Sequence, residues 1–246
     1  MSQPEVSQTL VLIKPDALKL SLTGYVLSQL SEFHTGLRFA GAKIVHVSRL
    51  LAEEHYAEHK GKYFYPPLID YLTGRLHYRD APHRRRVIAL VYSGPNAVAK
   101  VREISGPTSP HVARERAPGT IRALGTVVPV KDAAGKVVGE RMDNLIHASA
   151  TEIEAEREIK LWFRPADIMP AMRMYATGAA ETSFFLKDGK VATAGEPEGI
   201  CFLAKGDMAW QSDLDALRNI LAGQPAACSV DGVVAKYLMN EKLDED

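Results

Sequence analysis

The stretch Asn144-Leu-Ile-His147-Ala-Ser149, followed at once by Thr151-Glu-Ile-Glu-Ala-Glu-Arg-Glu158, is the part of the chain around which the fold is organised. Two apolar residues precede His147, a pattern that predicts a short buried strand ending at a histidine. A helix is predicted to begin directly afterwards. A titratable side chain is therefore placed at a junction between a strand and a helix, where functional side chains often lie.

The helix after this strand is well marked in the sequence. Thr151 and Glu154 have the spacing of a capping box, in which two side chains satisfy N–H groups at the helix start. An apolar stripe at helical spacing follows, made of Ala155, Ile159, Trp162 and Phe163. Glu158 lies on the same side of the helix as this stripe, so we expect it to point inward. An inward carboxylate needs a partner.

His147 is the expected partner of Glu158. A carboxylate bonded to one ring nitrogen fixes the tautomer and leaves the other nitrogen available as an acceptor or nucleophile. The alternative is a histidine that is satisfied in the core or on the surface and has no chemical role.

The composition sets limits on the protein class. The chain has 246 residues, with 30 Lys+Arg and 30 Asp+Glu, so no overall charge favours nucleic acid as a partner. No apolar stretch is long enough to span a bilayer, and the start lacks signal-peptide features. We expect a cytoplasmic protein without a membrane partner, in which Cys201 and Cys228 are free thiols.

Apolar runs at 9–13 and 87–91, and a loosely alternating segment at 38–49, predict three further strands. Helices are predicted at 25–33, 51–60, 68–72 and 96–104, and a hairpin at 125–144. This order predicts an α+β fold, a ferredoxin-like split βαβ antiparallel sheet with helices on one face.

Two other segments are less regular. The segment from 75 to 86 is rich in His, Tyr and Arg, which fits either a phosphate or nucleic-acid patch or a solvated loop. The segment from 105 to 119 contains three prolines and is predicted to be a long functional loop.

From about residue 8 to 168 the sequence resembles the nucleoside diphosphate kinases. The motifs that carry the resemblance occur in order: Thr9-Leu-Val-Leu-Ile-Lys14-Pro-Asp16, Glu54-His-Tyr56, Tyr63-Phe64, Ser93-Gly94, Gly106-Pro-Thr108-Ser-Pro110, Pro118-Gly-Thr-Ile-Arg122, Asn144-Leu-Ile-His147-Ala-Ser149 and Glu158-Ile-Lys-Leu-Trp-Phe163. The resemblance implies a ping-pong transfer of the γ-phosphoryl group from a nucleoside triphosphate, typically ATP, through a phosphohistidine to nucleoside diphosphates.

The resemblance also implies roles for individual residues. His147 is the expected nucleophile, Glu158 orients it with Ser149 bridging, and the catalytic set is completed by Lys14 and Tyr56. The expected nucleotide-binding residues are Lys14, Phe64, Arg102, Thr108, Arg122 and Asn144. Mg²⁺ is the implied cofactor, held mainly by nucleotide phosphates and water, with no protein ligand.

Two of these residues have a simpler explanation. Tyr56 could serve only to pack against its neighbours, and Phe64 could be a core residue.

The sequence departs from the family pattern at several points. Ala148 and Ala150 stand where the family usually has Gly and Asp. Segments near 75–86, 111–116 and 126–141 are predicted insertions. Because the middle one touches a loop used in subunit contacts, we expect a homo-oligomer that is smaller than the family's usual hexamer or tetramer.

The sequence predicts two parts, a kinase-like domain at 8–174 and a C-terminal appendage at 175–246. The appendage contains a hairpin signature at Asp188-Gly189, a strand at 199–203, a capped helix at 212–221 and a helix from about 233. Its apolar content predicts that it folds against the kinase portion, and we expect it to be separable from the chemistry.

Two other function classes remain. A catalytically weak scaffold would fit the altered neighbours of His147, although it would not need all the site residues. A nucleic-acid-binding relative, less expected, would use Arg84-Arg85-Arg86 with Tyr78 and would lose affinity steeply with added salt.

Overall fold

A four-stranded sheet with strand order β2-β3-β1-β6 forms the centre of the molecule. The computed structural model describes residues 6–131, 134–193 and 199–238. The strands of this sheet are β1 (Val6–Ile13), β2 (Arg38–Val45), β3 (Val87–Pro95) and β6 (Ile146–Ala148). Each neighbouring pair is antiparallel, and His147 on β6 pairs with Leu12 on β1.

Strand β1 is buried on both sides, and this decides how the helices are arranged. Side chains alternate between the two faces of a strand. Leu10 and Leu12 enter one hydrophobic core, while Val11 and Ile13 enter another. The sheet therefore has two apolar faces, and both need cover.

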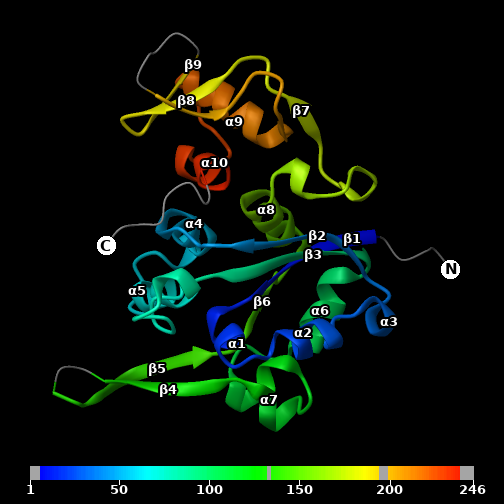
Figure 1. Cartoon of the computed structure of the whole chain (residues 1–246), viewed down its shortest axis with the longest axis vertical. Helices are drawn as coiled ribbons and strands as arrows, with labels where there is room; N and C mark the ends of the chain where they lie inside the picture. The colour runs from blue at the N-terminus through cyan, green and yellow to red at the C-terminus, as the bar shows by residue number, and fades with distance from the viewer. Residues whose placement is uncertain (1–5, 132–133, 194–198, 239–246) are drawn as a thin grey trace.

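Helices cover both faces of the sheet (Figure 1). One face packs against α4 (Arg49–His55), α5 (Tyr65–Leu72) and α8 (Glu152–Trp162). The other face packs against α1 (Pro15–Lys19), α2 (Thr23–Gln29) and α6 (Ala97–Ser105). The predicted ferredoxin-like α+β fold is confirmed. The prediction that helices cover only one face of the sheet was wrong.

The helix predicted at 25–33 is two shorter helices. Helix α2 ends at Gln29, and α3 (Glu32–Thr35) follows it. Gly36 ends α3 in the left-handed conformation with φ of 66°, as its position in the sequence predicted.

The hairpin β4 (Thr126–Lys131) and β5 (Val137–Asp143) lies apart from the main sheet and extends beneath it in Figure 1. The prediction of this hairpin is confirmed, although part of its turn lies outside the described residues. The prediction of a long loop at 105–119 was wrong in part, because this segment contains helix α7 (Pro110–Arg116). Pro110 starts this helix, a position where a proline costs no hydrogen bond.

The C-terminal part, from residue 175, has strands and helices of its own. The strands are β7 (Thr177–Ala179), β8 (Phe184–Lys187), β9 (Lys190–Thr193), β10 (Ile200–Leu203) and β11 (Met208–Trp210). They form two small sheets, ordered β10-β8-β9 and β11-β7. Two helices, α9 (Gln211–Leu221) and α10 (Val230–Tyr237), complete this part. Short 3-10 helices occur at Ala57–His59, Pro82–Arg84, Ile121–Leu124, Pro165–Asp167 and Pro170–Met172.

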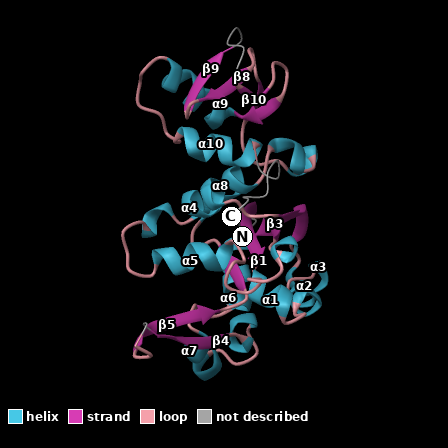
Figure 2. Ribbon diagram, turned by 60° about the vertical axis from the view of Figure 1, so that its left-hand side comes forward, coloured by secondary structure: helices cyan, strands magenta, loops and turns pink. Residues whose placement is uncertain are grey.

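The C-terminal part has a separate core, but it also joins the main one. Helix α10 lies between the C-terminal sheets and helices α4 and α8 (Figure 2). Trp210 and Ala235 belong to the same buried cluster as Trp162 and Phe163. The Trp210 Nε1–H donates to the carbonyl oxygen of Phe163 at 2.7 Å. The expectation that this part folds against the kinase portion is confirmed, while the domain division near residue 174 stays a prediction.

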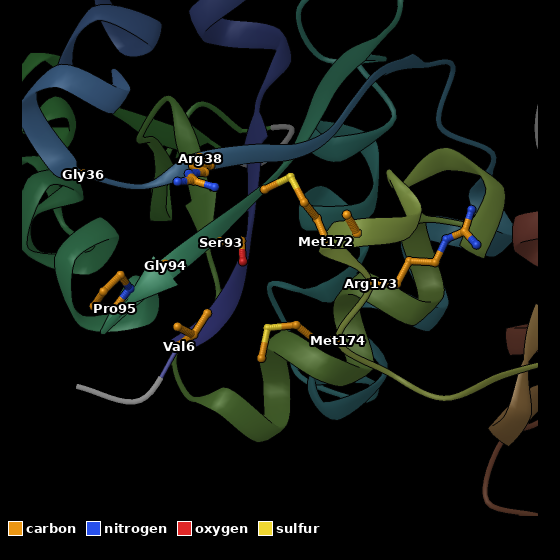
Figure 3. A pocket seen from close by; sticks show the side chains of 10 residues that line it. Val6, Gly36, Arg38, Ser93, Gly94, Pro95, Met172, Arg173 and Met174 are labelled. Atoms are coloured by element: carbon orange, nitrogen blue, oxygen red, sulfur yellow. The ribbon is translucent and has the colours of Figure 1, made fainter. Parts of the chain in front are cut away.

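A cavity of 420 Å³ lies at the start of β1. Figure 3 shows Val6, Arg38 and Ser93 on the sheet side of this cavity, with Met172 and Met174 from the segment after α8 on the other. None of its lining residues takes part in the larger cavity at the other end of β1.

Two further expectations can be compared with the structure. Cys201 and Cys228 are free, as predicted. No helix in the described parts of the chain is long and apolar enough to cross a membrane.

Candidate active site

A cavity of 660 Å³ lies where β1 ends and β6 begins, between α5 and the β4–β5 hairpin. Every predicted site residue except Ser149 lines it: Lys14, Tyr56, Phe64, Arg102, Thr108, Arg122, Asn144, His147 and Glu158. These residues come from widely separated parts of the sequence. Ser149 is fully buried directly behind Glu158.

The predicted contact between His147 and Glu158 is present. Nε2 of His147 lies 2.9 Å from Oε2 of Glu158. The same carboxylate oxygen accepts a hydrogen bond from the Ser149 hydroxyl at 2.6 Å, and this hydroxyl accepts from the Leu10 N–H at 3.2 Å. Ser149 thus fixes Glu158 to the sheet rather than standing between it and the histidine.

Burial alone would raise the pKa of Glu158, but the neighbouring His147 and the hydrogen bonds lower it to about 2. The carboxylate is therefore ionised at neutral pH. An ionised acceptor at Nε2 favours a proton on that nitrogen. Nδ1 of His147 makes no hydrogen bond to any residue that the structure describes, which leaves its lone pair available.

The start of α8 holds Glu158 in position. The Thr151 hydroxyl accepts from the Glu154 N–H at 3.1 Å, as the capping box predicted. The Glu154 carboxylate accepts from the N–H of Ala150 rather than that of Thr151. The reciprocal contact therefore reaches one residue further back than in a standard capping box, to the residue before the N-cap.

His55 is a site residue that the sequence did not single out. It is 1% exposed, and its ring centroid lies 4.5 Å from that of His147. The Trp162 indole N–H donates to Nδ1 of His55 at 3.2 Å, so the proton of the neutral ring belongs on Nε2. Burial lowers the pKa of His55 well below its usual value, which keeps the ring neutral. Its position directly before Tyr56, in one of the quoted motifs, was the available signal.

Lys14 and Asn144 form the second polar group of the cavity. The Lys14 ammonium donates to the Asn144 side-chain oxygen, and it lies 4.5 Å from the Tyr71 ring centroid. The Asn144 amide donates to the Thr108 carbonyl at 2.9 Å. Burial lowers the pKa of Lys14 to about 8. Tyr71, another residue that sequence reasoning missed, accepts from the Asn144 N–H at 3.2 Å.

Between Asn144 and His147 the backbone is strained. Leu145 has φ of 71°, a left-handed conformation that is unusual for a branched residue and costs on the order of 1–3 kcal/mol. Two hydrogen bonds hold it: its N–H donates to the Asp16 carboxylate at 2.9 Å, and its carbonyl accepts from the Lys14 N–H at 2.9 Å. This turn lets Asn144 and His147 both line the cavity.

Arg122 and Arg102 add positive charge. Arg122 is 6% exposed and donates to the carbonyls of Gly106 at 2.9 Å and Ile146 at 3.3 Å. Burial, with a contribution from Arg102, lowers the pKa of Arg122 to about 10, so it remains charged at neutral pH. Arg102 on α6 is exposed, and both Arg102 and Thr108 line the cavity.

Two aromatic residues, Tyr56 and Phe64, also line the cavity. Tyr56 is half-buried and packs against the main core, so it both packs and lines the cavity. Burial raises its pKa, and the hydroxyl is therefore protonated at neutral pH. Phe64 is 37% exposed at the start of α5, which excludes the core position considered from the sequence.

Among the described residues, one group of three could hold a metal ion: His55, His147 and Glu158, whose ligand atoms lie within 4.8 Å of one another. Two imidazoles with one carboxylate suit zinc better than Mg²⁺, which prefers oxygen ligands. The group therefore does not provide a protein site for Mg²⁺.

Known proteins are similar to this chain over 67% of its length. Residues 7–168 match the family model described as nucleoside diphosphate kinase. A nucleoside diphosphate kinase of Pyrococcus furiosus is 42% identical over 164 residues, which are 67% of this chain and 87% of that protein. The solved kinase of Aquifex aeolicus has a TM-score of 0.53 at 28% identity and covers 67% of this chain and 100% of its own. The kinase of Borrelia burgdorferi, solved as a transition state mimic with bound vanadate and ADP, has a TM-score of 0.52 at 28% identity and covers 69% of this chain and 94% of its own. The chain belongs to the nucleoside diphosphate kinase family.

Proposed function

We propose that this enzyme, a phosphotransferase, moves the γ-phosphoryl group of a nucleoside triphosphate to a nucleoside diphosphate through a phosphohistidine at His147. ATP is the expected donor. The observation that carries the assignment of His147 is its contact with Glu158, because that contact occupies Nε2 and leaves Nδ1 as the nucleophilic nitrogen.

In the first half-reaction the lone pair of Nδ1 forms a bond to the γ-phosphorus. The bond between this phosphorus and the β,γ-bridging oxygen breaks, and the nucleoside diphosphate leaves with that electron pair. In the second half-reaction a terminal β-phosphate oxygen of another diphosphate attacks the same phosphorus, and the bond to Nδ1 breaks. The histidine is regenerated, so the atoms and charges balance over the cycle.

The charged residues of the cavity support this chemistry through position and charge. Phosphoryl transfer needs little covalent help beyond alignment and neutralisation of the phosphate oxygens. Lys14, Arg102 and Arg122 supply the positive charge, and the Thr108 hydroxyl supplies a further donor. The ionised Glu158 stabilises the positive charge that develops on the imidazole as Nδ1 becomes phosphorylated.

We assign the remaining residues to the nucleoside and to support of the nucleophile. Phe64 stacks on the base, Asn144 contacts the ribose 3′-hydroxyl, and the Tyr56 hydroxyl donates to the transferring group. Ser149 positions Glu158 through its hydrogen bond.

Mg²⁺ enters this scheme as part of the substrate, the magnesium complex of the nucleotide. The cavity is lined by four cationic side chains, Lys14, Arg102, Arg122 and Arg141, and its described residues include no cluster of three carboxylates. This donor set suits phosphate rather than a bare cation. Mg²⁺ keeps several waters and binds readily through substrate phosphates.

A scaffold without activity is not favoured. Such a protein has no need for a nucleophilic histidine, an orienting carboxylate and buried cations in one cavity, since buried charges cost free energy. A homo-oligomer remains our expectation, and light scattering on the full chain measures its mass.

The test is to incubate the full chain with ATP labelled at the γ-phosphate. We expect a labelled protein whose phosphate is lost in acid and kept in base, and which passes the label to added diphosphates. His147→Ala should lose both the label and turnover. His83→Ala, at an exposed histidine outside the cavity, serves as the matched control. Turnover in His147→Ala would contradict the assignment.

A further inference from the structure

Arg141 lines the active-site cavity from the β4–β5 hairpin, and no predicted role accounts for it. Its Nε donates to Oδ1 of Asp143 at 2.7 Å, and one terminal nitrogen donates to Oδ2 at 2.9 Å. This two-point contact fixes the plane of the guanidinium. The other terminal nitrogen makes no hydrogen bond within the described part of the chain.

Asp143 is itself held by a residue from a distant segment. Nε2 of His77 lies 2.9 Å from Oδ2 of Asp143, and both side chains are nearly buried. Burial alone would raise the pKa of Asp143, but His77 and Arg141 lower it to about 2. The carboxylate is therefore ionised, and it keeps Arg141 in one orientation. The segment 75–86 and the hairpin, both predicted insertions, meet in this contact.

The direction of the Arg141 side chain follows from the strand. A Cβ added to Gly139 would lie 3.9 Å from Cε2 of Tyr63, so this face of β5 is turned toward the Tyr63–Phe64 turn. Side chains two residues apart on a strand share a face. Arg141 therefore points to the same side. In both ribbon views the hairpin and α5, which begins beside Phe64, lie on two sides of the region that contains the cavity (Figures 1 and 2).

The neighbours of Arg141 suit a base better than a phosphate. Its charge is balanced by Asp143 at close range, whereas Lys14, Arg102 and Arg122 already provide cations beside His147. The other hairpin residues in the cavity wall include the apolar Val130, Val138 and Met142. A guanidinium held flat by a carboxylate stacks well on an aromatic ring.

We propose that Arg141 is a specificity-determining residue whose guanidinium covers one face of the nucleotide base while Phe64 covers the other. This inference rests on the proposed function, since it assumes that the cavity binds a nucleoside diphosphate. Stacking depends on the plane of the group and on the area of the base. The contribution of Arg141 is therefore larger for a purine than for a pyrimidine.

The test compares Arg141→Leu and Arg141→Lys with the wild-type chain, using calorimetric binding of ADP, CDP and inorganic tripolyphosphate. Arg141→Leu is expected to weaken ADP binding by about 3- to 30-fold, with a smaller loss for CDP. Arg141→Lys keeps the positive charge and a partner for Asp143, but the lysine ammonium is not planar and cannot stack. It should therefore weaken ADP binding about as much as Arg141→Leu does. Tripolyphosphate binding should change by less than about twofold. In steady-state assays the loss should fall on the KM for ADP rather than on kcat.

Arg84→Leu is the charge-matched control, because Arg84 is exposed and lies outside the cavity. It is expected to leave ADP binding as in the wild type, and thermal unfolding checks that each variant is folded. Restored ADP affinity in Arg141→Lys, or an equal loss for tripolyphosphate, would show that Arg141 acts by charge on the phosphates and would overturn the proposal. Unchanged ADP affinity in Arg141→Leu would overturn it as well. Calorimetric binding needs no turnover, so a chain that binds ADP through Arg141 but forms no phosphohistidine would refute the proposed function alone.

Discussion

Nε2 of His147 and Oε2 of Glu158 lie 2.9 Å apart, and this contact joins β6 to α8 in the wall of the cavity. It leaves the imidazole with one nitrogen bound and one available. The carboxylate therefore has two effects to separate: it orients the ring, and it supplies negative charge.

Glu158→Gln separates these effects. The amide keeps the size and can still accept a hydrogen bond, but it cannot stabilise positive charge on the ring. We expect phosphoenzyme formation from ATP to slow by about 10- to 10³-fold while remaining detectable. Rapid-quench measurement of single-turnover labelling checks this. Glu152→Gln, at an exposed position on the same helix, is the control, and an unchanged rate in Glu158→Gln would mean that the carboxylate does not support the nucleophile.

Nucleotide binding should weaken above about pH 8. The pKa of Lys14 is lowered from 10.5 to about 8 by burial, so the side chain loses its proton as the pH rises through this value. We expect the KM for ATP to rise between about pH 8 and 9.5, and the rise to be absent in Lys14→Arg, which stays charged. A KM that is constant over this range would contradict a phosphate contact from Lys14.

Unfolding does not explain this pH effect. Because the folded pKa of Lys14 lies below its unfolded value, the unfolded chain binds more protons between about pH 8 and 10.5. The contribution of Lys14 to the free energy of unfolding therefore increases with pH in this window. Urea titrations at pH 7 and pH 9 measure the net change.

The enzyme should accept both purine and pyrimidine diphosphates. Phe64 offers an aromatic face, which every base can stack on, and the phosphates and ribose provide most of the binding free energy. Deoxy sugars should be accepted as long as the 3′-hydroxyl, the group that we propose Asn144 contacts, is present. Steady-state kinetics with the four common diphosphates and one 2′,3′-dideoxy analogue measure this. Turnover of a single base only would mean that the hairpin contacts a base edge.

Trp210→Ala should destabilise the whole chain by about 3–5 kcal/mol, as expected for a large aromatic removed from a core. Trp210 is fully buried and donates a hydrogen bond to the Phe163 carbonyl. Urea unfolding measures the loss. Met208→Ala, two residues earlier and 45% exposed, should cost far less. Equal effects would indicate that Trp210 is not part of the core.

The central parts of the site could be predicted from local patterns. Glu158 follows from its place on an apolar helical stripe, and His147 from its place after a buried pair. The continuous apolar run of β1 also contained the information that both sheet faces are covered, since a strand buried on one side alternates. The prediction that helices cover only one face was inconsistent with this pattern.

Other features depend on tertiary contacts that no local pattern records. His55 lies in a segment rich in charge, and its contacts include a hydrogen bond from Trp162, which is 107 residues away in the sequence. The contact between His77 and Asp143 joins two residues that are 66 positions apart in the sequence. Pro110 was interpreted as a loop residue, although a proline is equally common at the start of a helix, as in α7.

The position of α10 against α4 and α8 has a consequence for how the protein unfolds. Helix α4 carries His55, α8 carries Glu158, and the C-terminal part shares a buried cluster with both helices. Elements that share a core lose it together, so the chain should melt in one cooperative transition instead of two. A nucleotide that binds only the native cavity then raises the melting temperature of the C-terminal part by the same amount as that of the sheet, although no residue of α9 or α10 lines the cavity.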